Sequence, residues 1–278
     1  MYELSDISLR IQNKKILERI SLTLQAGSFT AVVGPNGAGK SSLLKVMAQE
    51  YDHYQGKVLI NKKLSTAYTP KELSLVRAVL PQNANVQFGF SVQQIIMLGR
   101  HAHLTSNRVN EKIINEVMFL TNTLELRERI YLSLSGGEKQ RVQLARVLAQ
   151  VWEDEGFPRY VLLDEPTSSL DIAQQQNIFS LARQVCKRNI GVLAIIHDLN
   201  QAVQYADQLY FLRDGKIITS GDARQVFTKS NIEETFCCRV NVYHDPCSNC
   251  PFIIPERERE GTKDEVRSTN THPQYSEI

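Results

Sequence analysis

A glycine-rich loop that follows a short apolar run constrains this chain more than any other feature. Residues 29–33, FTAVV, have the β-branched, apolar composition of a fully buried strand. The run passes directly into GPNGAGKSS and then into SLLKVMAQ, where apolar residues recur at helical spacing. A strand, a tight loop and a helix in this order predict the first unit of a sheet with helices packed against it.

The loop matches the pattern G-x-x-x-x-G-K-[ST], which is typical of proteins that hold a nucleoside triphosphate. Its glycines let successive backbone N–H groups face a phosphate, and the next helix presents its positive end there. We expect Lys40 to neutralise the β- and γ-phosphates and the Ser41 hydroxyl to bind Mg²⁺. The alternative is a glycine-rich turn that contains Lys-Ser by chance. The predicted ATP-binding residues are Gly34, Pro35, Asn36, Gly37, Ala38, Gly39, Lys40, Ser41 and Ser42.

A pair of carboxylates ends a second apolar run, YVLLDEP. Neighbouring residues at the end of a strand can face a metal ion and a water molecule respectively. We therefore expect Asp164 to reach Mg²⁺ and Glu165 to polarise the attacking water as a general base. Acidic residues after a strand are common, so the pair gains its weight from its place downstream of the loop in an alternating α/β pattern.

The segment Leu134-Ser135-Gly136-Gly137-Glu138 is a second candidate anion site. A serine and two glycines at a helix start expose N–H groups at the positive end of that helix. One triphosphate needs only one loop, so a second helix tip makes sense if it closes over the nucleotide of another subunit. The alternative is an ordinary capped helix, with Ser135 as the cap and Glu138 as its capping-box partner, and both can hold together.

LSGGEKQR, between the glycine-rich loop and the carboxylate pair, resembles the ABC ATPase family, and the resemblance covers residues 2 to about 230. It implies ATP and Mg²⁺ as ligands, with Mg²⁺ bound by Ser41, Gln82 and Asp164. Gln82, in VLPQN, then contacts the attacking water as well. The D-loop, SSLD, ends at Asp171 and is implied to cross a dimer interface. His197, in AIIHDLN, is implied to contact the γ-phosphate, although a lone histidine after an apolar run is more often structural.

The remaining pattern predicts an α/β fold, a P-loop NTPase core with an antiparallel β region at its N-terminus. Residues 2–24 alternate as two strands around the polar turn QNKK, and residues 56–61 form another strand. Residues 70–128 instead show helical spacing and few strand-like runs. We therefore expect a helical subdomain, at about 83–145, inserted in the core.

After that insertion, strands and helices alternate as a doubly wound sheet requires. The expected strands are 160–164, 192–196 and 208–212, with a helix from about 171 to 187 and a hairpin turned at Asp214-Gly215. We expect one ATPase domain over residues 2–255. Residues 256–278 contain almost no large apolar side chains and are expected to be a disordered tail.

The partners follow from the resemblance and from two absences in the sequence. No stretch approaches 18 consecutive apolar residues, and the N-terminus has no secretory signal pattern. A net charge of +2 gives no reason to expect a nucleic-acid surface. We expect a homodimer of cassettes at the cytoplasmic face of the inner membrane. A polytopic permease would dock near residues 83–104, with a periplasmic solute-binding protein in the same system.

RAVLPQN and SVQQIIMLGR resemble the ATP-binding subunits of importers for large iron or cobalt chelates. Within that group, the tryptophan and acidic insert in AQVWEDEGFPRYVLLDEP resemble haem importers. The resemblance implies haem uptake; a ferric siderophore or cobalamin importer stays open, as does a soluble ABC ATPase of cofactor assembly. A repair-type protein is disfavoured because no heptads separate Lys40 from Ser135. A translation-type protein is disfavoured because the chain has one set of motifs.

Three smaller features leave alternatives. Ile11 occupies the position where the family usually has an aromatic residue that stacks on adenine. His101 and His103 could bind haem, but an exposed loop against the permease is favoured. A zinc knuckle or an ordinary hairpin, RVNVYHD with CPFIIP, would account for His244 and the thiols of Cys237, Cys238, Cys247 and Cys250. The hairpin is favoured.

Overall fold

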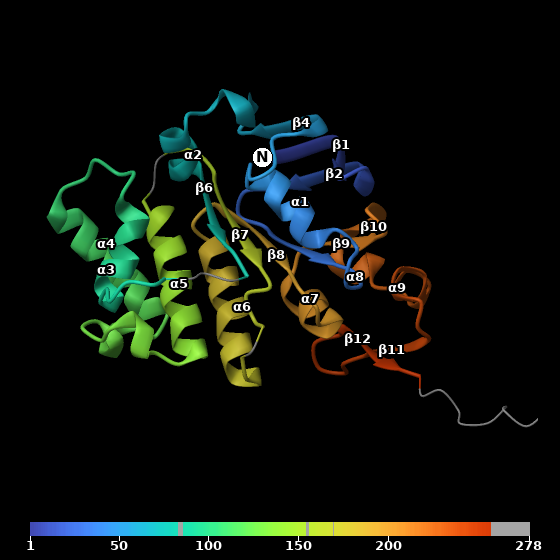
Figure 1. Ribbon diagram of the computed structural model, residues 1–278. Coiled ribbons are helices and arrows are strands. Elements are labelled where there is room, and N and C mark those ends of the chain that lie inside the picture. The colour runs from blue at the N-terminus through green and yellow to red at the C-terminus, as the bar shows by residue number, and fades with distance from the viewer. Residues whose placement is uncertain (83–85, 154–155, 169, 257–278) are drawn as a thin grey trace, which may run out of the picture.

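The computed structural model describes residues 1–82, 86–153, 156–168 and 170–256. A six-stranded sheet in the order β10-β9-β3-β8-β7-β6 crosses the centre of the molecule (Figure 1). All of its neighbours are parallel except β9 and β10, which form the predicted hairpin. Its strands are β3 (Phe29–Val33), β6 (Arg77–Leu80), β7 (Arg159–Asp164), β8 (Ile190–Ile195), β9 (Gln208–Arg213) and β10 (Lys216–Asp222).

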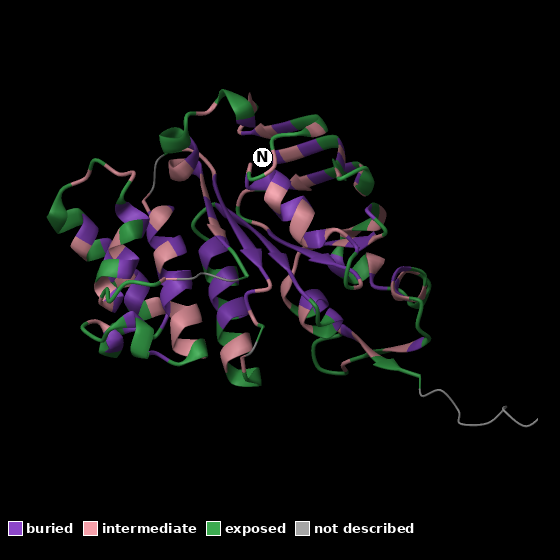
Figure 2. Ribbon diagram, in the orientation of Figure 1, coloured by how far each residue is buried: buried purple, intermediate pink, exposed green. Residues whose placement is uncertain are grey.

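The central strands are covered on both faces, as their unbroken apolar sequences require. Every residue of β3, β7 and β8 is buried, and Figure 2 shows these strands as the buried centre of the molecule. This confirms the predicted α/β fold.

One element of this sheet was not predicted. The expectation for residues 70–128 was helical, but Arg77–Leu80 forms β6 and pairs in parallel with β7. The strand has only four residues and follows directly on α2 (Pro70–Val76), so its alternation is too short to stand out. The helical part therefore begins after β6, nearer to the expected boundary at residue 83.

A smaller antiparallel sheet, in the order β2-β1-β4-β5, covers one face of the core. Its strands are β1 (Tyr2–Ile11), β2 (Lys14–Leu24), β4 (Tyr54–Ile60) and β5 (Lys63–Leu64). Helix α1 (Lys40–Met47) lies between the two sheets, because Leu43 and Met47 share one apolar cluster with Leu22 and Leu162. The predicted N-terminal β region is confirmed.

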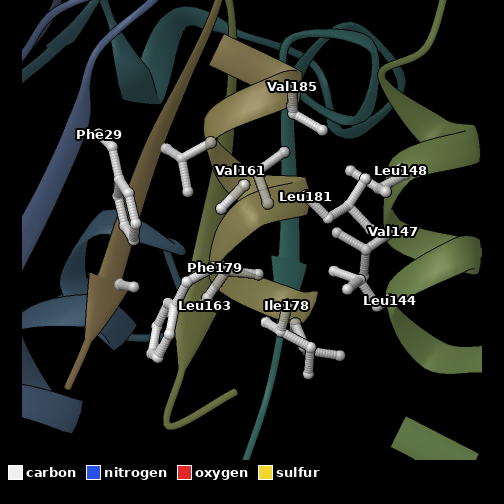
Figure 3. Close-up of a cluster of buried hydrophobic side chains, with 14 of the residues drawn as sticks. Phe29, Leu144, Val147, Leu148, Val161, Leu163, Ile178, Phe179, Leu181 and Val185 are labelled. Carbon is white, nitrogen blue, oxygen red and sulfur yellow. The ribbon is translucent and has the colours of Figure 1, made fainter. Parts of the chain in front are cut away.

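The opposite face of the central sheet is covered by α5 (Gly136–Gln150) and α6 (Ile172–Cys186). Figure 3 shows the apolar side chains of both helices meeting those of the strands. The labelled members of this cluster are Phe29, Leu144, Val147, Leu148, Val161, Leu163, Ile178, Phe179, Leu181 and Val185. Helices α3 (Val92–Met97) and α4 (Asn107–Leu120) pack on α5 and form a helical block at one end of the molecule (Figure 1).

The C-terminal part adds short elements beside the core. These are α7 (Leu199–Tyr205), α8 (Ala223–Val226), α9 (Lys229–Phe236), and the antiparallel hairpin β11 (Val240–His244) with β12 (Pro251–Pro255). Single 3-10 turns occur at Ser65–Ala67, Leu98–Arg100, Leu124–Leu126 and Tyr131–Ser133. The predicted hairpin is confirmed; the predicted tail lies outside the described residues apart from Glu256.

The acidic insert holds the end of α5 in place. Trp152 is 4% exposed, and its Nε1 donates to Glu116 Oε2 of α4 at 2.7 Å. The Arg188 guanidinium lies 4.2 Å from the centre of the Trp152 ring. The insert thus connects the helical block to the core. Across the described ranges, no helix is both long and apolar enough to span a membrane.

Candidate functional site

The glycine-rich loop is shaped by close backbone packing. A Cβ atom on Gly34 would lie 2.0 Å from the Leu212 carbonyl oxygen, so only glycine fits there. Gly39, with φ of +103°, precedes α1 as its N-cap, a conformation that other residues rarely adopt. The loop therefore follows β3 and points the N-terminus of α1 at the space that it encloses, as predicted for a phosphate site.

Lys40 is buried, with 5% of its surface exposed, and its side chain turns back on its own loop. Its Nζ donates to the Gly34 carbonyl at 2.8 Å and to the Pro35 carbonyl at 3.0 Å. Burial lowers the pKa of Lys40, while the negative charges of Glu165 and Asp164 act in the opposite direction. A buried cation held by two neutral carbonyls is poised to exchange one of them for a charged phosphate oxygen.

Asp164 meets Ser41 at the end of β7. The Ser41 hydroxyl donates to Asp164 Oδ1 at 3.3 Å, across 123 residues of sequence. Burial, and then the charge of Glu165, raise the pKa of Asp164, while the hydrogen bond from Ser41 lowers it. Hydroxyl and carboxylate oxygens are the donors that Mg²⁺ prefers, and a cation here would relieve the repulsion between the two carboxylates. The residues present therefore fit Mg²⁺.

Glu165 sits where two distant predicted residues converge on it. Gln82 Nε2 donates to Glu165 Oε2 at 2.7 Å, and His197 Nε2 lies 2.5 Å from Glu165 Oε1. Glu165 has φ of 51°, a left-handed conformation that is uncommon outside glycine and strains the backbone. The structure therefore brings together Gln82, Glu165 and His197, the three residues predicted to be catalytic.

The second predicted anion site lies at the start of α5. The capping box is present: the Ser135 hydroxyl accepts from Glu138 N at 3.3 Å, and Glu138 Oε2 accepts from Ser135 N at 2.8 Å. Ser135 and Gly136 are exposed, and a Cβ on Gly136 would have no neighbour within 4 Å. The structure is therefore compatible with both interpretations of this segment. The helix is capped by its own residues, and its N-terminus is open to a ligand.

Gln140, on the first turns of α5, was not predicted as a site residue. Its Nε2 donates to the Pro166 carbonyl, next to Glu165. Asp171 caps α6 by accepting from Gln174 N at 2.8 Å, and Ser169 of the D-loop lies outside the described residues. The Gln140 bond links the helix that follows the signature segment to the turn that carries the carboxylates. The only sequence signal for the Gln140 contact is the glutamine in LSGGEKQR.

The expectation of an exposed histidine loop is wrong for His103. Its side chain is 2% exposed, its Nδ1 lies 3.0 Å from Glu153 Oε2, and its Nε2 lies 2.8 Å from the Gln150 carbonyl. The acidic insert draws the ring inward, a contact that sequence spacing does not reveal. His101 is exposed as expected.

The structure also places Ile11 and the four C-terminal thiols, the remaining candidates from the sequence. Ile11 is partly buried against the apolar cluster beneath the antiparallel sheet. Cys237, Cys238 and Cys247 are exposed, and Cys250 is half-buried. Over the described ranges, no three His, Cys, Asp or Glu side chains are grouped so that they could hold a metal ion, so the structure gives no support to a zinc knuckle.

Comparison with known proteins assigns this site to a family. The ABC transporter family model matches residues 17–168, a range that contains the loop, the signature segment and both carboxylates. The chain belongs to the ABC transporter ATP-binding family. The cassette is 43% identical to a hemin import ATP-binding protein, HmuV, of Gloeobacter violaceus, over 92% of this chain and 94% of that protein.

A second relative and a solved structure also match the cassette. The cassette is 39% identical to HmuV of Escherichia coli O157:H7, over 91% of this chain and 99% of that protein. Among solved structures, it is similar to a metal-chelate type ABC transporter in an inward-facing conformation. That match has a TM-score of 0.77 and 25% identity, and it covers 92% of this chain and 97% of the other. An ATP-binding subunit of this kind works with a membrane permease.

Proposed function

We propose that the cassette hydrolyses MgATP as a homodimer and thereby drives haem uptake through a permease in the inner membrane. The observation that carries the enzymatic part is the contact of Gln82 and His197 with the strained Glu165. The support for haem comes from the names of the relatives, together with the buried Trp152 insert.

In this mechanism the loop binds the triphosphate and Lys40 neutralises its charge. Ser41, Asp164 and Gln82 would hold Mg²⁺, which supplies charge neutralisation when bound. Glu165 accepts a proton from the attacking water, and His197 orients Glu165 and the γ-phosphate. The exposed helix tip at Ser135–Gly137 of a second copy completes each site, with Asp171 at the contact between the copies.

The direct test of this mechanism is Glu165→Gln, which keeps the shape of the side chain but removes its basicity. We expect ATP binding to persist, turnover to fall by about 10²-fold or more, and an ATP-bound dimer to accumulate. Unchanged turnover in this variant would remove Glu165 from the role proposed for it.

The permease would dock on the helical block, near residues 83–104, on the cytoplasmic face of the membrane. Exposed apolar side chains gather in this segment: Phe88 is 70% exposed, Leu98 53% and Leu104 90%. Such side chains mark a surface that a partner covers. We expect Leu104→Asp to abolish co-purification with the permease, whereas Leu64→Asp, on the antiparallel sheet, should not.

The transported solute is tested in the assembled system, with the permease and a periplasmic solute-binding protein. We expect haem to stimulate ATP hydrolysis when it is presented by that binding protein. Stimulation by a ferric siderophore or by cobalamin, but not by haem, would assign the cassette to another importer of the same group. Absence of any co-purifying membrane protein would favour a soluble ATPase instead.

A further inference from the structure

The C-terminal hairpin is tied to helix α7 by one side-chain amide. Ile253 N donates to Asn200 Oδ1 at 2.8 Å, and Asn200 Nδ2 donates to the Ile253 carbonyl at 3.3 Å. The side chain of Asn200 thus pairs with the free edge of β12 in the way that another strand would. Figure 1 shows α7 lying directly beside the hairpin.

Helix α7 begins immediately after the proposed switch histidine. His197 follows β8, and Asp198 caps α7 by accepting from Asn200 N at 2.8 Å and from Gln201 N at 3.2 Å. The main chain of His197 is therefore fixed on one side by a buried strand and on the other by the first turn of α7. Because α7 has only seven residues, that turn depends on tertiary contacts for its position.

The neighbouring residue holds the same turn on its other side. Gln201 Nε2 donates to Gln175 Oε1 at 2.5 Å, and Gln175 Nε2 donates to the Leu170 carbonyl of the D-loop at 3.1 Å. Two consecutive amide side chains therefore clamp α7 between the hairpin and α6. Lower on the helix, Cys250 Sγ lies 3.9 Å from the Val203 carbonyl, which adds a second, weaker contact with the hairpin.

The hairpin is itself anchored, so it can act as a fixed reference for α7. Val240 is fully buried, and Val242 and Ile253 pack against the main apolar cluster. Glu233 Oε1 of α9 accepts from Val240 N at 3.0 Å and holds the start of β11. Movement of Asn200 would therefore break its two bonds to the hairpin and would leave the hairpin itself in place.

We infer that Asn200 is a positioning residue for ATP hydrolysis. By pairing with Ile253 it fixes the first turn of α7, and this turn aims the His197 imidazole at Glu165. The inference rests on the proposed role of His197. A merely structural role for Asn200 would lower the stability of the whole chain without acting through His197.

The test is a double-mutant cycle in the full chain with Asn200→Ala and His197→Ala. We expect Asn200→Ala to lower kcat about tenfold, with KM for MgATP nearly unchanged. In the His197→Ala background the same change should cause no further loss. Asn200→Asp keeps an acceptor for Ile253 N and should give an intermediate kcat, and Asn241→Ala, on the same hairpin, is the matched control.

The outcomes distinguish a failure of the positioning role of Asn200 from a failure of the role proposed for His197. An equal loss of kcat in both backgrounds, or no loss in Asn200→Ala, overturns the positioning role. A His197→Ala variant with full activity instead overturns the role proposed for His197 itself. If Asn200→Ala does not fold, the Asn200→Asp variant is measured in both backgrounds and decides by the same comparison.

Discussion

The two candidate phosphate sites of this chain use the same chemistry in opposite surroundings. The loop at Gly34–Ser41 is packed against the rest of the chain, so tightly that a Cβ on Gly34 would collide with a backbone carbonyl. The tip at Ser135–Gly137 starts a helix that is already capped by its own residues, and Gly136 faces open space. The loop is therefore held by packing within the chain, whereas the tip lies open on the surface.

This difference supports the proposal that the loop and the helix tip of one site come from two different copies of the chain. A helix N-terminus attracts an anion wherever it lies, but it holds one firmly only inside an enclosed site. In the proposed mechanism, the loop would enclose one side of the triphosphate together with Lys40 and the carboxylates. The exposed tip offers the N–H groups and the positive end of a helix but does not enclose a ligand. The loop of a second copy would supply that enclosure. Substitutions in the two halves should therefore fail in different ways.

The largest effect is expected in the loop, from Gly34→Ala. The new methyl group would lie 2.0 Å from the Leu212 carbonyl oxygen, so the strand and the loop must separate. We expect a loss of about 3 kcal/mol of stability, which lowers Tm by roughly 6–12 °C in a chain of this size. Gly37→Ala, with open space but φ of +80°, is the control and should cost only about 1–2 kcal/mol. Equal melting curves for the two variants would show that the loop is not packed as described.

Gly136→Asp should separate stability from activity. Its side chain meets no neighbour, and a carboxylate in the first turn favours the helix, so Tm should stay within about 1 °C of the wild type. The same charge would repel a triphosphate, and we expect turnover to fall by about 10²-fold. Calorimetry and an ATPase assay on one preparation measure both. Wild-type turnover would mean that this tip does not contact nucleotide.

Asp164→Asn should trade activity for stability. Burial and the charge of Glu165 raise the pKa of Asp164. The Asp164 carboxyl therefore binds its proton more tightly in the folded chain than in the unfolded chain. Its contribution to stability is therefore present at low pH and is lost as the pH rises through the folded pKa. At pH 8 we expect the variant to melt about 2–4 °C higher than the wild type, a gain of about 1 kcal/mol, with Mg²⁺-dependent hydrolysis abolished. The gain should shrink as the pH is lowered toward about 4. A variant that is less stable than the wild type at pH 8 contradicts this account.

The smallest effect is expected from Ile11→Tyr. A ring at this position would restore the stacking surface for adenine that the family usually has there. We expect ATP to bind about fivefold more tightly, corresponding to about 1 kcal/mol of stacking, with kcat unchanged. Titration with ATP and GTP measures the gain. An equal increase in affinity for ATP and GTP would agree with stacking on either base. No increase in affinity for ATP would show that adenine does not lie against Ile11.

The sequence predicted the parts of the site that are local. The loop between β3 and α1, the carboxylates at the end of β7 and the cap at Ser135 each follow from a few neighbouring residues. Strand β6 was not predicted because four residues are too few to show the alternation of apolar and polar side chains that marks a strand. The meeting of Gln82 with Glu165, 83 residues apart, and of Asn200 with Ile253 depends on tertiary packing. The burial of His103 depends likewise on the position of the acidic insert.

The most direct test of the account mixes two inactive chains, Lys40→Ala and Gly136→Asp. Neither homodimer has an intact site, but a mixed dimer pairs the wild-type loop of one chain with the wild-type helix tip of the other. At equal concentrations, half of the dimers should be mixed with one intact site each, so we predict that ATPase activity recovers to about a quarter of the wild-type value. Activity that stays at the level of the separate variants, under conditions where mixed dimers form, would contradict a site built from two copies.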